Sequence, residues 1–187
     1  MKLSIIMLLL FLLNTQIVKS QTFSSVDQLS SYVGKKFSDL ESGLSIKSNY
    51  KTTSLGIERR SYDFETYSVI VSESDDIKTI QEISIYTNKI KNIQEIWYNI
   101  VSEMNRNKKY EFIKSFVADR DDKITTNRLD YQQLITLLRK SFKSDEWIYE
   151  AKYKNKDTYY LISCSPVSVD IKIRNTPFEK QSYENEK

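Results

Sequence analysis

The spacing of apolar residues changes along this chain, and that change restricts the fold more than any other feature. Two segments, Tyr67–Glu73 and Ile80–Thr87, are rich in β-branched and aromatic residues, which predicts β-strands. In the second segment Ile83 and Ile85 alternate with polar neighbours, which predicts one buried face and one wet face. The next segment repeats its apolar residues at every third or fourth position: Ile90, Ile93, Ile96, Trp97, Ile100, Val101 and Met104. This spacing predicts a helix over residues 92–105 whose apolar stripe lies on the sheet.

Further segments follow the same two patterns. The first helix has apolar residues from Val26 to Leu40, and Gly43 is well placed to end it. Residues 110–119 follow a polar break, and their aromatic and β-branched content favours a strand. Another helix starts at Asp130, and three strands complete the pattern: EWIYEAKY, TYYLISC and VSVDIKI.

These elements place the chain in the α+β class. We expect a single α+β domain over residues 21–176, with an antiparallel sheet of about seven strands and about three helices, followed by a polar C-terminal tail over residues 177–187. A chain of this length supports one hydrophobic core and is too short for two independent ones.

Two of the helical segments resemble each other. Val26–Asp39 aligns without gaps with the segment from Tyr131 to Ser144, and the matches include Leu29 with Leu134. Predicted strands follow both segments, so the pattern allows a weak internal duplication of a helix-plus-strands unit. The alternative is coincidence, because amphipathic helices often share leucine, lysine and phenylalanine at these spacings.

Residues 1–20 have the three parts of a secretory signal peptide. Lys2 precedes the apolar run Leu3–Leu13, and short side chains stand before Gln21. The run is shorter than the ~20 apolar residues of a spanning helix, although an uncleaved anchor is the alternative. We therefore expect cleavage near Ser20 and Gln21, export of a bacterial protein to the periplasm or beyond the cell, and no membrane insertion of the mature chain.

Composition excludes several classes of chemistry. The chain has no histidine and one cysteine, Cys164, so it cannot form an internal disulfide, a histidine-containing triad or a histidine or thiolate metal cluster. Without Lys2 and Lys19, the 28 basic residues become 26, against 25 acidic residues. Such a balanced charge argues against nucleic acid as a partner. We expect no cofactor and no metal.

Three segments resemble chemical motifs only in part. The acidic loop Asp119–Asp130 lacks the glycine and the final glutamate of a calcium loop. Ser48 and Lys51 have the S-x-x-K spacing of some serine hydrolases, but three glycines in the whole chain provide no glycine-rich oxyanion turn. Glu146 and Glu150 would suit a carboxylate-based hydrolase, whereas strand alternation predicts a wet outer face for both.

Tyrosine is the residue type that points to a function. The predicted binding residues combine tyrosines with lysines in the last strands: Tyr149, Tyr153, Tyr159, Lys152 and Lys154. Tyrosine joins apolar area to a hydrogen-bonding tip and is enriched at recognition surfaces, although strand propensity alone would also explain it. We expect an exported, non-enzymatic binding protein for an unknown protein or glycan. The alternatives are a histidine-free hydrolase of glycans and an immunity-like or inhibitor protein. The oligomeric state does not follow from the sequence.

Overall fold

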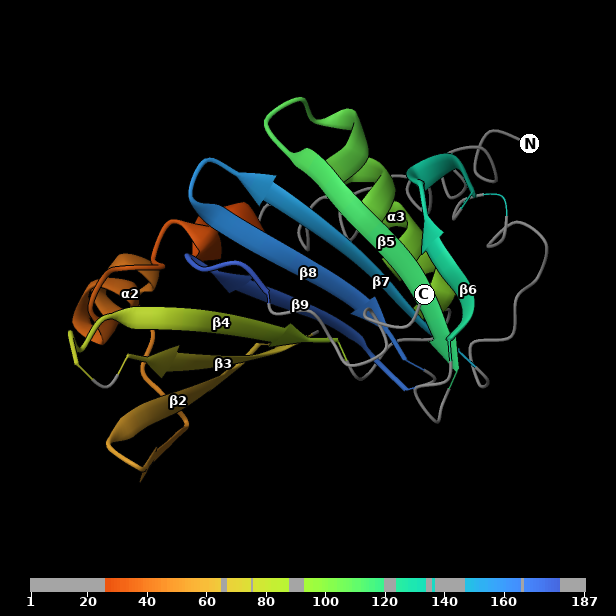
Figure 1. The fold of residues 1–187 in the computed structure, drawn as a ribbon. Helices are drawn as coiled ribbons and strands as arrows, with labels where there is room; N and C mark the ends of the chain where they lie inside the picture. Colours follow the sequence, from red (N-terminus) through yellow and green to blue (C-terminus); the bar gives the residue numbers. More distant parts are fainter. Residues whose placement is uncertain are drawn as a thin grey trace, which may run out of the picture.

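A computed structural model of the protein shows one large antiparallel sheet with helices packed against it (Figure 1). The structure describes residues 26–64, 67–74, 76–87, 93–119, 124–133, 136, 147–165 and 167–178. The predicted signal peptide and most of the polar tail lie outside these residues.

The elements have the following bounds. The helices are α2 (Phe37–Leu44), α3 (Ile93–Arg106) and a short helix over residues 26–30, with further helical residues at 131–133. The strands are β1 (Tyr50–Ser54), β2 (Ile57–Asp63), β3 (Ser68–Glu73), β4 (Ile80–Tyr86), β5 (Glu111–Asp119), β6 (Ile124–Leu129), β7 (Trp147–Asn155), β8 (Thr158–Cys164) and β9 (Val169–Arg174).

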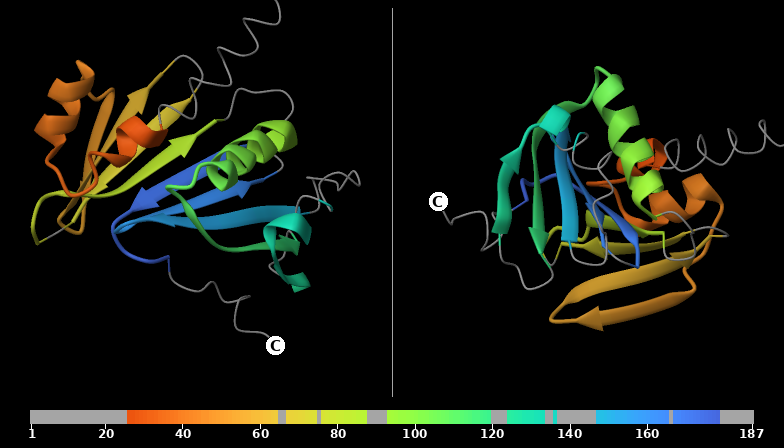
Figure 2. Two further views of the ribbon diagram at one scale, coloured as in Figure 1. Left: turned by 90° about the horizontal axis from the view of Figure 1, so that it is seen from above. Right: turned by 90° about the vertical axis from the view of Figure 1, so that its right-hand side faces the viewer.

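The nine strands stand in the order β1-β2-β3-β4-β9-β8-β7-β5-β6, and all neighbours are antiparallel. The sheet bends between its β1–β4 part and its β5–β9 part, and α2 and α3 lie in the angle between the two parts (Figure 2). We call the side of the sheet that carries α2 and α3 the inner face, and the opposite side the outer face.

The hydrophobic core lies between the inner face and the helices. Trp97 on α3 is fully buried, and its indole Nε1 donates a hydrogen bond of 3.1 Å to the carbonyl oxygen of Ile162 on β8. Side chains alternate between the two faces along a strand, so every second residue of a strand points to the inner face. In β9 these residues are Val169, Ile171 and Ile173, and all three are buried. The sheet therefore uses the period of two that the sequence shows.

The two parts of the sheet repeat each other in register. A twofold rotation about the middle of the β4–β9 ladder, where Ser84 pairs with Lys172, exchanges β4 with β9, β3 with β8 and β2 with β7. The same rotation superimposes the residue pairs of the matching ladders: Ile83–Val71 on Ile171–Ile162, Ile85–Val69 on Ile173–Tyr160, and Tyr62–Val69 on Tyr153–Tyr160.

The helix contacts repeat as well. Tyr62 on β2 donates its hydroxyl to Glu41 on α2 at 3.1 Å, and Tyr153 on β7 donates its hydroxyl to the Val101 carbonyl on α3 at 3.2 Å. The helix that corresponds to α2 is therefore α3. The sequence match between residues 26–39 and 131–144 selects a different helix, so it does not identify the repeat that the ladders show.

The α+β class and the antiparallel sheet are confirmed, and several elements match their predictions. Strands β3, β4, β5, β7, β8 and β9 and helix α3 all occur where the sequence predicts them. The strand number of about seven was wrong, because β1 and β2 form a separate hairpin and residues 124–129 add β6 at the far edge. Gly43 lies inside α2, and Ser45 ends that helix in the left-handed conformation at φ 54°.

Candidate recognition surface

The five predicted binding residues do not share one face of the sheet. Tyr149 and Tyr153 are fully buried on the inner face, where the Tyr149 ring lies 5.8 Å from that of Trp97. Grouping them with the lysines was wrong, because neighbouring residues of a strand point to opposite faces. Their partners in the prediction, Lys152, Lys154 and Tyr159, belong to the outer face.

Two further charged residues extend this group across the outer face. The strand register places Glu82 of β4 beside Arg174 of β9, Arg174 beside Tyr159 of β8, and Tyr159 beside Lys154 of β7. We call these four residues the outer row. All four side chains are partly exposed, and none contributes to the inner core.

Contacts within the outer row hold its side chains in place. The Lys154 ammonium lies 5.4 Å from the centre of the Tyr159 ring, which is within cation–π range. The Arg174 guanidinium lies 4.0 Å from the Phe178 ring, 3.8 Å from a carboxylate oxygen of Glu82, and donates a 2.9 Å hydrogen bond to the Pro177 carbonyl. The row thus presents two cations and a tyrosine in a restrained arrangement.

Lys152 differs from Lys154 although both point to the outer face. Only 4% of Lys152 is exposed, and its ammonium lies 5.3 Å from the centre of the Phe116 ring. A partner in solution therefore has little access to Lys152. Strand alternation explains the face on which Lys152 lies, and the sequence gives no sign of its burial.

The acids of the outer face are less exposed than the sequence predicts. Glu150 is 7% exposed and accepts a hydrogen bond of 3.4 Å from Ser163, so it does not lie on a wet face. Asp170 pairs with Ser163 from the other side, which places one strand between the two carboxylates. Burial raises the pKa of Asp170, and Ser168 and Lys172 oppose this shift only in part.

An ion cluster on the inner side of β2 was not predicted. Arg60 contacts Glu41 at 2.8 Å and Glu58 at 2.7 Å, and its guanidinium lies 4.4 Å from the Phe37 ring centre. Burial alone would lower the pKa of Arg60, but the two carboxylates outweigh it and raise that pKa. The cluster joins α2 to the sheet and is largely withdrawn from solvent.

The remaining chemical motifs do not assemble into a reactive site. The amine of Lys51 contacts a carboxylate oxygen of Glu58 on the neighbouring strand at 2.6 Å, so its ion-pair partner is Glu58. Burial raises the pKa of the Cys164 thiol to about 12, with a smaller contribution from Asp170. Within the described ranges, no three acidic or cysteine side chains are grouped closely enough to hold a metal ion.

The acidic loop predicted to resemble a calcium site becomes in part strand β6, and its residues 120–123 lie outside the described residues. Among the helices that the structure describes, none has the length and apolar character required to cross a bilayer.

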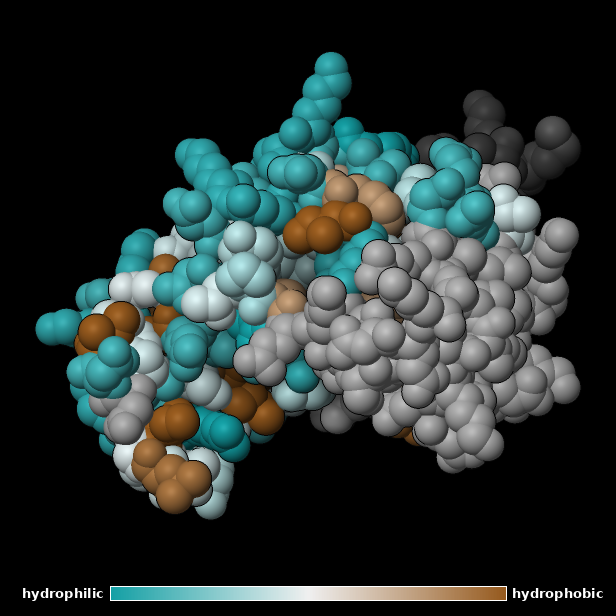
Figure 3. Space-filling view, viewed as in Figure 1, coloured by the Kyte–Doolittle hydropathy of each residue, from teal (hydrophilic) through white to brown (hydrophobic). Residues whose placement is uncertain are grey.

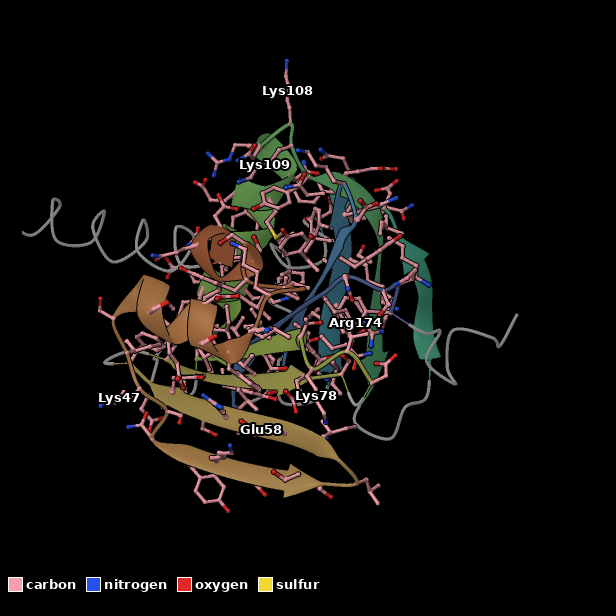
Figure 4. The ribbon with its side chains drawn as sticks, turned by 90° about the vertical axis from the view of Figure 1, so that its left-hand side faces the viewer. Lys47, Glu58, Lys78, Lys108, Lys109 and Arg174 are labelled. Atoms are coloured by element: carbon pink, nitrogen blue, oxygen red, sulfur yellow. The ribbon has the colours of Figure 1, made fainter. Side chains whose placement is uncertain are left out.

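The view of Figure 3 looks onto the outer face and shows a mostly hydrophilic surface over β4, β8 and β9. Figure 4 shows Lys108 projecting into solvent, away from the sheet, whereas Arg174 lies against it. Arg174 and Glu82 were not among the predicted binding residues. Only the pairing of β4 with β9 brings them together, and a strand order of this kind is not readable from residue spacing.

No protein-family model matches the chain, and no curated protein matches it. Among solved structures, the chain is similar to a cysteine-rich secretory protein from Staphylococcus aureus subsp. aureus Mu50, with 12% identity and a TM-score of 0.40. The alignment covers 77% of this chain and 43% of the staphylococcal chain, so this chain spans less than half the length of that protein.

Proposed function

We propose that this is an exported, non-enzymatic protein that binds an acidic surface of a partner protein through the outer row. The observation that supports this most is the placement of Lys154, Tyr159 and Arg174 side by side on the face of the sheet opposite α2 and α3. Tyrosine and arginine are enriched at the centres of protein interfaces, because each combines contact area with directional hydrogen bonds.

The restrained geometry of the row also favours binding. The cation–π contacts of Lys154 and Arg174 limit the rotamers of these long side chains before a partner arrives. Ordering such a side chain on association costs about 0.5–1.5 kcal/mol, so an ordered side chain loses less entropy. Nearby Lys172 is partly exposed and adds a third positive charge beside the row.

The test is capture of a partner by the immobilised protein from the cells that produce it. The double variant Lys154→Ala/Tyr159→Ala should lose the partner that the unchanged protein retains. Lys108→Ala is the matched control, since it removes an exposed lysine far from the row. Equal recovery of the partner by the double variant and the control would contradict the choice of surface.

The identity of the captured partner separates the remaining interpretations. An enzyme that loses activity in the complex would make the protein an inhibitor or an immunity-like protein. A glycan that competes with the captured protein, and whose binding also depends on Tyr159, would replace the protein partner in the proposal.

Export is tested separately. Mass spectrometry of the full-length chain after expression in a bacterial host should detect a mature form that begins at Gln21, outside the cytoplasm. A Leu9→Arg/Leu10→Arg variant interrupts the apolar run and should remain unprocessed. An intact N-terminus on exported protein, or cytoplasmic retention of the unchanged chain, would contradict the proposal.

A further inference from the structure

Strand β1 is an edge strand with an accessible backbone. In the part of the chain that the structure describes, β1 pairs with β2 on one side, and it stands at the end of the strand order. All five of its residues are exposed, and its register with β2 runs without a bulge. Proteins commonly protect such an edge with proline, a bulge or free lysines, because it can pair with another strand. The one lysine of β1, Lys51, contacts Glu58 of the same hairpin.

The internal repeat shows what fits beside such an edge. The twofold rotation that exchanges β2 with β7 makes Ser61 of β2 equivalent to Lys152 of β7. Tyr50 of β1 pairs with Ser61, and Lys114 of β5 pairs with Lys152, so the same rotation places β1 on β5. In the second part of the sheet, β6 runs antiparallel along the outer edge of β5. Among the described residues, no strand occupies the corresponding position beside β1. β6 contains the dipeptide Thr125-Thr126, and β1 contains Thr52-Thr53.

The hairpin turn determines which backbone groups of β1 point outward. Leu55 and Gly56 both have positive φ, 51° and 79°, and form the two-residue turn between Ser54 and Ile57. The pair that flanks such a turn is hydrogen-bonded within the hairpin, and hydrogen-bonded pairs alternate along the ladder. The outward N–H and C=O groups are therefore those of Lys51 and Thr53.

A second copy of β1 matches this edge. In an antiparallel pair with its twofold axis at Thr52, each Thr52 faces the same residue of the other copy. Lys51 then faces Thr53, and Tyr50 faces Ser54, so all five residues pair. Residues that lie opposite each other in a ladder have their side chains on the same face of the sheet, whereas neighbouring residues of one strand have theirs on opposite faces. A symmetric antiparallel pair must therefore place its twofold axis at a residue that faces its own copy, and not between two residues. A centre at Lys51 would oppose two lysines, and repulsion disfavours it.

We propose that two copies of this protein associate through β1, antiparallel and centred on Thr52, to form one continuous sheet across the dimer. The outward N–H and C=O groups of Lys51 and Thr53 then hydrogen-bond to Thr53 and Lys51 of the second copy. This contact lies on β1 and is independent of the outer row, whose residues belong to β4, β7, β8 and β9.

The test is the mass of the protein in solution as a function of concentration, measured by analytical ultracentrifugation on the full chain as purified. The unchanged protein should shift from one chain to two as its concentration rises. Thr52→Lys and Thr52→Glu each place like charges directly opposite at the axis and should weaken the dimer by about tenfold or more. Because Thr52 is exposed, both variants should unfold like the unchanged protein.

An equimolar mixture of the two variants distinguishes this pairing from other dimers. Opposite charges then meet at the axis, so the mixture should form dimers that neither variant forms alone. A monomer at all concentrations would overturn the proposal. So would dimers of undiminished affinity in both variants, which would place the contact on another surface.

Thr52→Cys provides an independent measurement. Directly opposed residues of a non-hydrogen-bonded antiparallel pair have Cα atoms about 4.5 Å apart, within the range of a disulfide. Mild oxidation should join two chains, whereas Ser38→Cys, an exposed position on α2, is the control and should give far less cross-linked product. The native Cys164 is fully buried and should not interfere. Equal cross-linking of the two variants would overturn the register.

Discussion

Tyrosines of two neighbouring strands, β7 and β8, lie in different environments in this protein. Tyr153 is fully buried on the inner face, whereas Tyr159 on the next strand is partly exposed beside Lys154. The alternation in YEAKYK separates the tyrosines from the lysines, so their faces could be predicted from the sequence. Which face the helices cover could not, because tyrosine is compatible with both environments.

Tyr153→Phe should destabilise the protein by about 1 kcal/mol, since it removes one hydrogen bond and leaves the packing in place. The lost bond is the one that the Tyr153 hydroxyl donates to the Val101 carbonyl at 3.2 Å. Urea denaturation of both proteins measures the difference in the free energy of unfolding. Tyr159→Phe is the control and should change it by about 0.5 kcal/mol or less. Equal effects of the two variants would contradict the assigned faces.

Asp170 should make stability depend on pH in an unusual direction. Burial raises its pKa in the folded state above the ordinary 3.8, so the folded protein binds the proton more tightly than the unfolded chain does. The contribution of Asp170 to stability therefore increases as the pH falls through the folded pKa, and the charged form is unfavourable at neutral pH. Asp170→Asn should raise the free energy of unfolding near neutral pH. It should also remove the pH dependence of stability that arises from Asp170.

Denaturation of both proteins at about pH 7 and about pH 4 measures the effect. The difference in the free energy of unfolding between Asp170→Asn and the unchanged protein should be smaller at the lower pH. Glu111→Gln, at an exposed position on β5, controls for the loss of one negative charge. A lower stability of Asp170→Asn at neutral pH would show that the carboxylate stabilises the fold.

At the scale of elements, prediction succeeded where one face of an element is buried. Helix α3 and strands β3 and β4 have apolar periods that only burial explains, and the structure has them where predicted. β6 was missed because ITTNRL has no apolar alternation and follows an acidic segment. An edge strand is defined by backbone pairing, and its side chains need carry no apolar pattern.

The β1–β2 turn contains a strained residue whose replacement should stabilise the hairpin. Leu55 has φ 51° and is 93% exposed, so it carries the cost of the left-handed region without burying its side chain. That cost is about 1–2 kcal/mol for most residues and is smaller for asparagine. Leu55→Asn should raise the free energy of unfolding by about 1 kcal/mol, measured by urea denaturation. Leu55→Ala keeps the strain and should give no comparable gain, and equal effects of the two would contradict this reason.

At the scale of the whole molecule, the register of the ladders reveals a repeat that sequence comparison misses. β2 and β3 correspond to β7 and β8 with one offset in residue number, and β4 corresponds to β9 with another, because the intervening turns differ in length. Few identities remain, such as Tyr62 with Tyr153 and Ile83 with Ile171. The paired helices share a position on the inner face and little sequence.

Among the described strands, the β4–β9 ladder is the one pairing that joins the two parts of the sheet, so it should make them unfold together. Ile83 of β4 pairs with Ile173 of β9, and Ile171 of β9 pairs with Ile85 of β4. Ile83 and Ile171 are equivalent positions in the repeat, and both are fully buried. Each change to alanine should lower the free energy of unfolding by about 2–5 kcal/mol.

Two spectroscopic probes can follow the two parts of the sheet. Both tryptophans, Trp97 and Trp147, belong to the second part, whereas far-ultraviolet circular dichroism reports on the whole sheet. Ile83→Ala should therefore lower the denaturation midpoint seen by tryptophan fluorescence as much as that seen by circular dichroism. If fluorescence kept its original midpoint while circular dichroism lost part of its signal, the two parts would be separate folding units, and the continuous sheet would not couple them.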